Sequence, residues 1–153
     1  MTDFISKIIT LILIFIMCVI APLMISYAST QATCNRLALN ETVVFIDTVT
    51  NKGYITPEDI RSFNISLNSH GRVFKSTIER QVLVEEPLPD STTKICYFTE
   101  DISDITKEQA LNTGDIVKVS VEGVTASDGE RLMVAILRVW GGIFQFSHAG
   151  VVL

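Results

Sequence analysis

The sequence predicts an α+β protein in which a long N-terminal transmembrane helix continues into a stalk and carries a small, mostly antiparallel sheet with two or three short helices. Three observations predict it: an uncharged apolar run, a helical spacing of apolar residues directly after that run, and several later segments in which apolar and polar residues alternate. We therefore divide the chain into an N-terminal segment with a transmembrane helix (1–28), a helical stalk (29–52) and a head (53–153).

The apolar run covers residues 8–28 and contains no charged side chain. About 21 residues at 1.5 Å each span roughly 30 Å, the thickness of the hydrocarbon core of a membrane. We expect a single pass through the cell membrane, with lipid as a partner. The side chains expected to contact lipid or neighbouring helices are Ile8, Leu11, Phe15, Val19, Pro22 and Leu23.

Two features bear on the fate of this run. Lys7 precedes it and Arg36 is the first basic residue after it, which favours an internal N-terminus and an extracytoplasmic head. Ser26-Tyr27-Ala28 has the small-x-small form of a signal-peptide cleavage site, so a cleaved signal is the alternative. The run is longer than the 7 to 15 residues of a signal-peptide core, which favours a retained anchor.

The stalk is predicted from apolar residues on one helical face. Leu39, Val43, Ile46 and Val49 follow one another at steps of four and three, and no proline or glycine occurs between the anchor and Gly53. The sequence Asn51-Lys52-Gly53 predicts the end of this helix, because glycine adopts the left-handed conformation easily and a cation suits the last turn.

The head begins with a second helix and a long strand. Thr56-Pro57-Glu58-Asp59 combines a capping residue, a proline at the first helical position and two acids, and the helix should end near residues 68–71. Residues 73–85 then alternate between apolar and polar, which predicts a strand with one wet face. Arg80 interrupts the apolar face, so we expect it near an edge of the sheet.

Further elements follow from shorter patterns. Residues 94–99 form a second strand and a hairpin with the first, and residues 115–123 form a third. Thr106-Lys107-Glu108-Gln109 offers a capping box for a short helix ending at Asn112-Thr113-Gly114. Residues 128–140 favour a helix, although their branched side chains also suit a strand, and residues 143–153 predict a final strand.

Few residues point to chemistry. His70 and His148 are the two histidines, and neither has a partner at metal-ligand spacing. Nucleophile elbows, phosphate loops and dinucleotide fingerprints do not occur in the sequence, and the net charge of −5 disfavours a nucleic-acid partner. We therefore predict no catalytic residue, no cofactor-binding residue, no cofactor and no metal ligand, and expect a protein that is not an enzyme.

Two groups leave alternatives open. Glu100, Asp101 and Asp104 form an acidic cluster that favours a solvated turn but could serve acid–base catalysis in a secreted enzyme. Cys34 and Cys96 are the cysteines outside the apolar run. They form one possible disulfide in an exported head, or else Cys96 is a small buried hydrophobe and Cys34 a free thiol.

Several segments resemble a known family. They are Ser6-Lys7-Ile8, residues 38–47, residues 51–58 (the most specific part), Phe63, Leu67, Gly71, Ile78-Glu79 and Thr113-Gly114-Asp115. They resemble small single-span, pilin-like or pseudopilin-like proteins of Gram-positive bacteria, encoded with tight-adherence or type IV pilus-like assembly machinery. The resemblance implies a hydrophobic helix carrying an extracytoplasmic α+β head. The chain departs from a standard pilin in having no glutamate before Glu41.

Three functions are then open. The leading hypothesis is a membrane-anchored, pilin-like structural or accessory subunit of a filament or secretion system, packing through residues 8–28 against copies of itself or other pilin-like subunits. The alternative is a bitopic protein that does not polymerise and whose head binds a ligand or a partner of an export machine. The second alternative is a secreted enzyme with a cleaved signal peptide.

Overall fold

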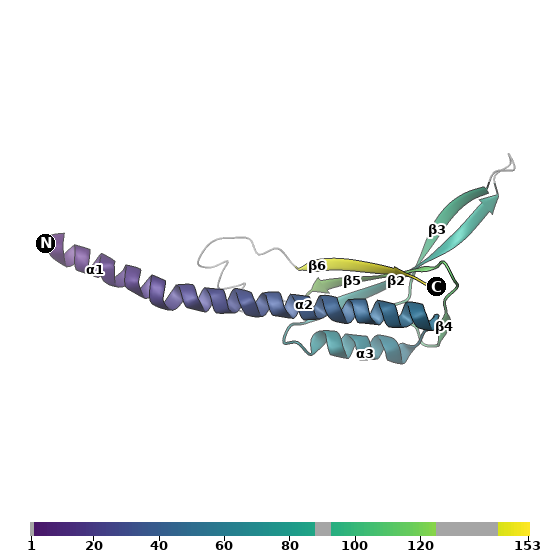
Figure 1. Ribbon diagram of the computed structural model, residues 1–153, viewed down its shortest axis with the longest axis horizontal. Coiled ribbons are helices and arrows are strands. Elements are labelled where there is room, and N and C mark those ends of the chain that lie inside the picture. Colours follow the sequence, from purple (N-terminus) through teal and green to yellow (C-terminus); the bar gives the residue numbers. More distant parts are fainter. Residues whose placement is uncertain (1, 88–92, 125–143) are drawn as a thin grey trace.

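The computed structural model describes residues 2–87, 93–124 and 144–153 (Figure 1). A long apolar N-terminal helix precedes a small antiparallel sheet and a further helix, which confirms the predicted α+β class. The elements in chain order are α1 (Thr2–Phe15), a π-helical turn η1 (Ile16–Ile20), α2 (Ala21–Lys52), β1 (Tyr54–Ile55), α3 (Pro57–Asn68), β2 (Phe74–Pro87), β3 (Thr93–Asp101), β4 (Gln109–Ala110), β5 (Ile116–Gly123) and β6 (Gln145–Val151).

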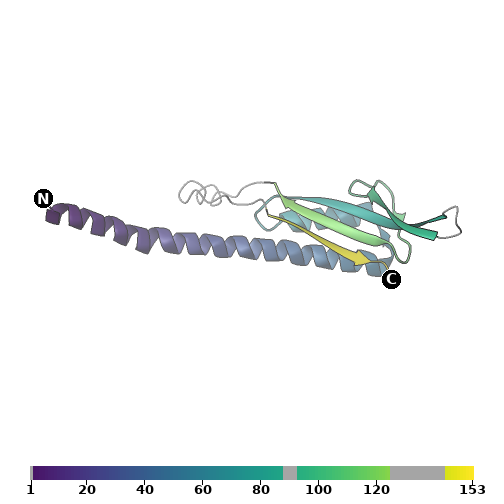
Figure 2. The same ribbon diagram turned by 90° about the horizontal axis from the view of Figure 1, so that it is seen from above.

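The first three elements form one continuous helical rod, which curves gently and ends inside the head (Figures 1 and 2). Pro22 lies in the first turn of α2, directly after the π-helical turn, where the backbone N–H of Ala21 donates to the carbonyl of Ile16, five residues back. Proline lacks an N–H and its ring crowds the carbonyl four residues before it. The wider π turn accommodates that crowding without breaking the helix.

Both predicted signals at the junction of α2 and α3 are confirmed. Gly53 ends α2 in the left-handed conformation at φ 73°, and its N–H donates to the carbonyl of Val49 at 3.0 Å. Thr56 caps α3 in a capping box, in which the Thr56 hydroxyl and the Asp59 carboxylate each accept the backbone N–H of the other residue. Lys52 at the end of α2 also forms an ion pair with Asp59 at 2.9 Å, which ties the two helices together.

The main sheet has the order β3-β2-β5-β6 with every pair antiparallel, and the predicted hairpin is the β2–β3 pair. Helices α2 and α3 lie on one side of this sheet (Figure 2). Their side chains and the inward-facing residues of β2 and β5 form the core. Its largest fully buried apolar side chains are Ile46, Val49, Ile55, Leu67, Ile78, Ile102, Val117, Val119 and Val121.

The expected helix over residues 106–114 is wrong. Gln109 and Ala110 instead form β4, which pairs with Ile55 and Tyr54 of β1, and the N–H of Leu111 donates to the carbonyl of Gly53. This pairing places Leu111 in the core, so burial of an apolar residue prevails over a local capping signal.

The expected edge position of Arg80 is also wrong. Arg80 lies on the interior strand β2, between Glu100 of β3 and Val117 of β5, and is 8% exposed. Its guanidinium Nε donates to Oδ2 of Asp115 at 2.8 Å, and Asp115 is itself buried. A buried arginine is tolerated at an interior position because a buried carboxylate neutralises it.

The stalk also differs from expectation, because its second half lies in the head. The buried residues of α2 run from Ala38 to Thr50, whereas the expected stripe residue Leu39 is 46% exposed. Two threonines, Thr42 and Thr50, occupy the buried face and donate their hydroxyls to the carbonyls of Ala38 and Ile46 in the same helix. Ile46 and Val49 of the predicted stripe are buried, and the two threonines join them because their hydroxyls are satisfied within the helix.

The end of the chain is described in part. Strand β6 lies within the segment 143–153 predicted as a strand and pairs with β5. The helix expected over residues 128–140 lies outside the described residues.

Candidate membrane and assembly helix

The apolar part of the rod is exposed on all sides. Leu11 is 70% exposed, and Ile8, Phe15, Val19, Pro22 and Leu23 are exposed as well, so every residue expected to contact lipid or neighbouring helices is available to do so. The segment Phe4–Lys52 contains a window of mean hydropathy 3.1 with no buried share, and by length and composition it is able to cross a membrane. Apolar surface on this scale is costly in water and calls for a cover of lipid or protein.

Polar side chains within the rod find partners in the rod itself. The hydroxyls of Thr10, Thr30 and Thr33 donate to the carbonyls of Ser6, Ser26 and Ser29 at 2.8 to 3.0 Å. Each contact joins residues four apart. Thr10 lies within the apolar run, so its bond shields a hydroxyl that would otherwise face hydrocarbon alone. The sequence contains no charged residue between Lys7 and Arg36, and the rod therefore carries no unpaired charge through this stretch.

The head is fastened to the rod at the end of the sheet that lies nearer the N-terminal apolar segment. The thiol of Cys34 donates to the carbonyl of His70 at 3.1 Å, and His70 Nε2 lies 3.9 Å from Oε1 of Glu41. Both contacts join α2 to the turn between α3 and β2. They place His70 in a structural role, whereas His148 lies exposed on β6.

The two cysteines considered for a disulfide are not brought together. Cys34 lies on α2, Cys96 lies on β3 opposite Val84, and both thiols are free. Cys34 instead contacts the turn that leads into β2, as described above.

The acidic cluster spans the end of β3, with Glu100 and Asp101, and the turn after it, where Asp104 is exposed. The carboxylate of Asp101 accepts hydrogen bonds from the hydroxyl of Ser103 at 2.6 Å and from its backbone N–H at 2.9 Å, and these bonds lower the pKa of Asp101. Glu100 accepts a hydrogen bond from Gln109. In the part of the chain that the structure describes, no group of three or more His, Cys, Asp or Glu side chains is placed to hold a metal ion.

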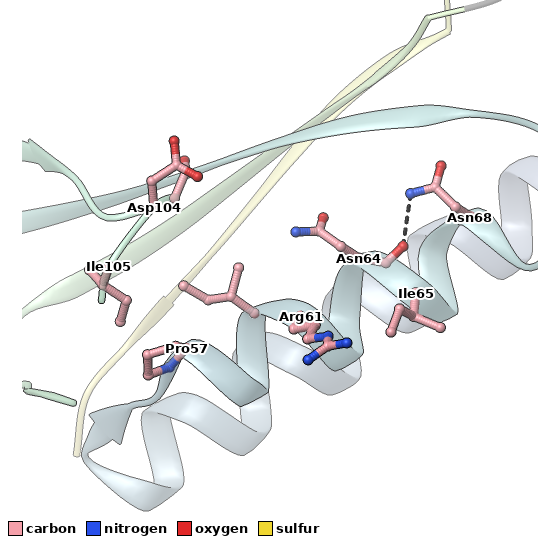
Figure 3. A pocket seen from close by; sticks show the side chains of 9 residues that line it. Pro57, Arg61, Asn64, Ile65, Asn68, Asp104 and Ile105 are labelled. Carbon is pink, nitrogen blue, oxygen red and sulfur yellow. Dashed lines mark hydrogen bonds between the residues drawn. The ribbon is translucent and has the colours of Figure 1, made fainter. Parts of the chain in front are cut away.

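An open groove of about 700 Å³ runs between α3 and the loop after β3 (Figure 3). Arg61 and Asp104 contribute charged groups, while the two asparagines of its wall are already engaged. Asn64 Oδ1 accepts the hydroxyl proton of Ser76 at 2.6 Å, and Asn68 Nδ2 donates to the carbonyl of Asn64 at 2.8 Å. Sequence reasoning missed this groove, since its only local signal is the spacing of three and four residues along α3.

Comparison of the chain with protein-family models, with curated proteins and with solved structures finds no match.

Proposed function

We propose that this protein is a membrane-anchored, pilin-like structural or accessory subunit of a type IV pilus-like filament or secretion system. One observation carries the proposal: an apolar helix, exposed on every side, runs without interruption into the core of the head it carries. A helix that served only as an export signal would need no such continuity with the folded domain.

The rod has two roles in this proposal. Residues 8–28 lie in lipid with the head on the extracytoplasmic side, and on assembly the same surface packs against copies of this chain or other pilin-like subunits. The exposed apolar side chains support both roles, because lipid and a neighbouring apolar helix are equally acceptable covers.

The test is to fractionate cells and shear off their surface filaments. We expect the full chain in the membrane and also in the filaments if it is a structural subunit. Recovery from the membrane alone would leave the accessory role, and recovery as a soluble head alone would contradict both.

A second candidate is a bitopic protein that binds a ligand without polymerising, and the groove beside α3 is the observation that favours it. The full chain in detergent micelles would then bind a small polar ligand, and Arg61→Ala would weaken binding while the exposed control Lys75→Ala would not. Asn64 and Asn68 already form internal hydrogen bonds, so these groups are less available to a ligand. This favours the pilin-like subunit over the ligand-binding protein.

A secreted enzyme is the least supported function. It would need the anchor removed and the acids Glu100, Asp101 and Asp104 acting on a substrate. The lowered pKa of Asp101 keeps that carboxylate ionised, which is unsuited to a general acid at neutral pH. A mature N-terminus at Ser29 together with substrate turnover would support this function.

A further inference from the structure

The main sheet has two open edges. Within the described residues, β3 and β6 each pair with one strand only. The β2–β3 hairpin also extends past the rest of the sheet (Figure 1), because pairing of β2 with β5 stops at Gln81 whereas its pairing with β3 continues to Pro87. A two-stranded ribbon is less stable than a sheet of three or more strands, so this extension would be stabilised by a further strand.

The extension displays apolar side chains. Phe98 is 64% exposed and Tyr97 is 55% exposed, and Leu83 and Val84 on the facing strand are exposed too. On the opposite edge of the sheet, Val151 of β6 is 52% exposed. An open strand edge with exposed apolar side chains is a template for the addition of another strand.

We infer that β3 of one copy pairs with β6 of the next copy and thereby continues the sheet from subunit to subunit. This inference rests on the proposed function, which holds all copies with their helical rods parallel. In such an arrangement the order β3-β2-β5-β6 makes β6 of one copy and β3 of its neighbour run in opposite directions, since successive strands alternate. The new pair is therefore antiparallel, like every other pair in the sheet.

The registers of the strands fix how the two copies must shift. Strand β6 lies level with residues 75–81 of β2, whereas β3 lies level with residues 79–87. If two copies stood at equal height, β6 of one copy and β3 of the other would overlap only at the level of residues 79–81 of β2. A shift by an even number of residues keeps the helices of both copies on the same side, because side chains alternate between faces.

Shifts of four and six residues both pair all seven residues of β6. At about 3.3 Å per residue they amount to roughly 13 and 20 Å, with the copy that supplies β6 displaced away from the membrane. The four-residue shift places Ala149 opposite Tyr97 of the neighbour, and the six-residue shift places Ser147 there. The latter also pairs Phe146 with Phe98 on the side of the sheet that carries the helices.

Full pairing thus requires a displacement along the rod, which two copies anchored at the same depth do not have. The contact joins two different edges, so it can repeat without closing and favours a filament over a closed dimer. We therefore expect the contact to form when subunits leave the plane of the membrane during assembly.

Cysteine cross-linking of the full chain in cells tests this contact. In a background with Cys18, Cys34 and Cys96 replaced by serine, we combine Tyr97→Cys with Ser147→Cys or with Ala149→Cys. The matched control combines Tyr97→Cys with Glu122→Cys, which lies on the same face but on the interior strand β5. The side chains changed to cysteine are all exposed, so the fold should tolerate these changes.

We expect at least one edge pair to give a ladder of dimers and larger species several-fold above the control. A yield equal to that of the control would overturn the inference, and so would dimers formed by Tyr97→Cys alone, which would indicate a two-fold contact. A chain retaining only Cys18 reports association of the anchors separately. Cys18 dimers without an edge ladder would refute the edge contact and leave the proposed function intact, whereas absence of both would contradict the edge contact and the role as a filament-forming subunit.

Discussion

Arg80 and Asp115 form the buried ion pair on which the centre of the sheet depends. Their side chains are 10% and 3% exposed, so neither charge can recover its hydration once the other is removed. We expect Arg80→Ala to lower the free energy of unfolding of the full chain in detergent micelles by about 3 to 5 kcal/mol in chemical denaturation.

The control for Arg80 is Lys118→Ala. Lys118 pairs with Glu79 on the wet face of the same sheet, where both groups are about one third exposed, and its loss should cost less than about 1 kcal/mol. Equal effects of the two substitutions would contradict the role assigned to burial.

Asp59 makes the stability of the fold depend on pH. Burial alone would raise the pKa of its carboxyl, but the hydrogen bonds from Thr56 and Lys52 outweigh burial and lower the pKa below the usual 3.8. A carboxyl whose pKa is lower in the folded state stabilises the fold above its unfolded pKa, and that stabilisation is lost as the pH falls through the folded value. We expect Asp59→Asn to be less stable than the parent at pH 7, with the difference shrinking below about pH 4.

Thermal unfolding between pH 2 and 7 measures this difference. Asp47→Asn serves as the control, because Asp47 is an exposed carboxylate on the preceding helix. A difference in unfolding temperature between Asp59→Asn and the parent that stays constant down to pH 2 would show that the capping box, and not the charge, accounts for the effect.

At the scale of elements, the rod should behave as a membrane helix. Val19 lies in its π-helical turn and is exposed. Val19→Asp places a charge near the centre of the apolar segment, at a cost of about 2.5 to 3.5 kcal/mol on insertion scales. We expect loss of the chain from the membrane fraction, measured by carbonate extraction, whereas Val19→Leu should leave it there. Membrane retention of Val19→Asp would contradict the assignment of this segment.

Strand β6 and helix α2 meet at Gly150. A Cβ atom at this position would lie 2.5 Å from Cγ2 of Ile46, so an alanine would push the strand away from the helix. We expect Gly150→Ala to lower the midpoint of urea unfolding, with a loss of about 1 to 3 kcal/mol as is usual for overpacked sites. Ser147→Ala, on the outer face of the same strand, is the control and should change the midpoint little.

The elements that the sequence predicted well are those with local chemical signals. The end of α2 at Gly53, the cap of α3 at Thr56 and the alternating strands β2 and β5 all depend on neighbouring residues. Interactions between distant segments decided the rest. Arg80 finds its carboxylate 35 residues away in the chain, and the strand β4 exists because β1 offers it a partner. No local pattern contains that information.

For the candidate site, too, the sequence predicted one part and missed another. The exposure of the apolar helix followed from composition, and the structure places every predicted anchor residue on its surface. The open edges of β3 and β6 did not follow from the sequence, because strand order depends on which strands pair. The buried threonines of α2 show a further reason, since Thr42 satisfies its own hydroxyl and packs as an apolar residue.

At the scale of the whole molecule, the rod and the head form one unit. The C-terminal half of α2 belongs to the core of the head, so a force or displacement applied to the anchor reaches the sheet directly. This continuity suits a subunit that is held in a membrane and then moved into an assembly. It also means that loss of the apolar segment would remove the surface through which we propose that copies associate, while the buried residues 38–50 would stay in the head.

Intact-mass spectrometry of the chain recovered from membranes and from sheared surface filaments tests the central claim most directly. We expect the mass in every fraction that contains the chain to include residues 8–28, because the apolar helix stays attached in the working protein. A single soluble species beginning at Ser29, with none of the longer chain in either fraction, would contradict that claim.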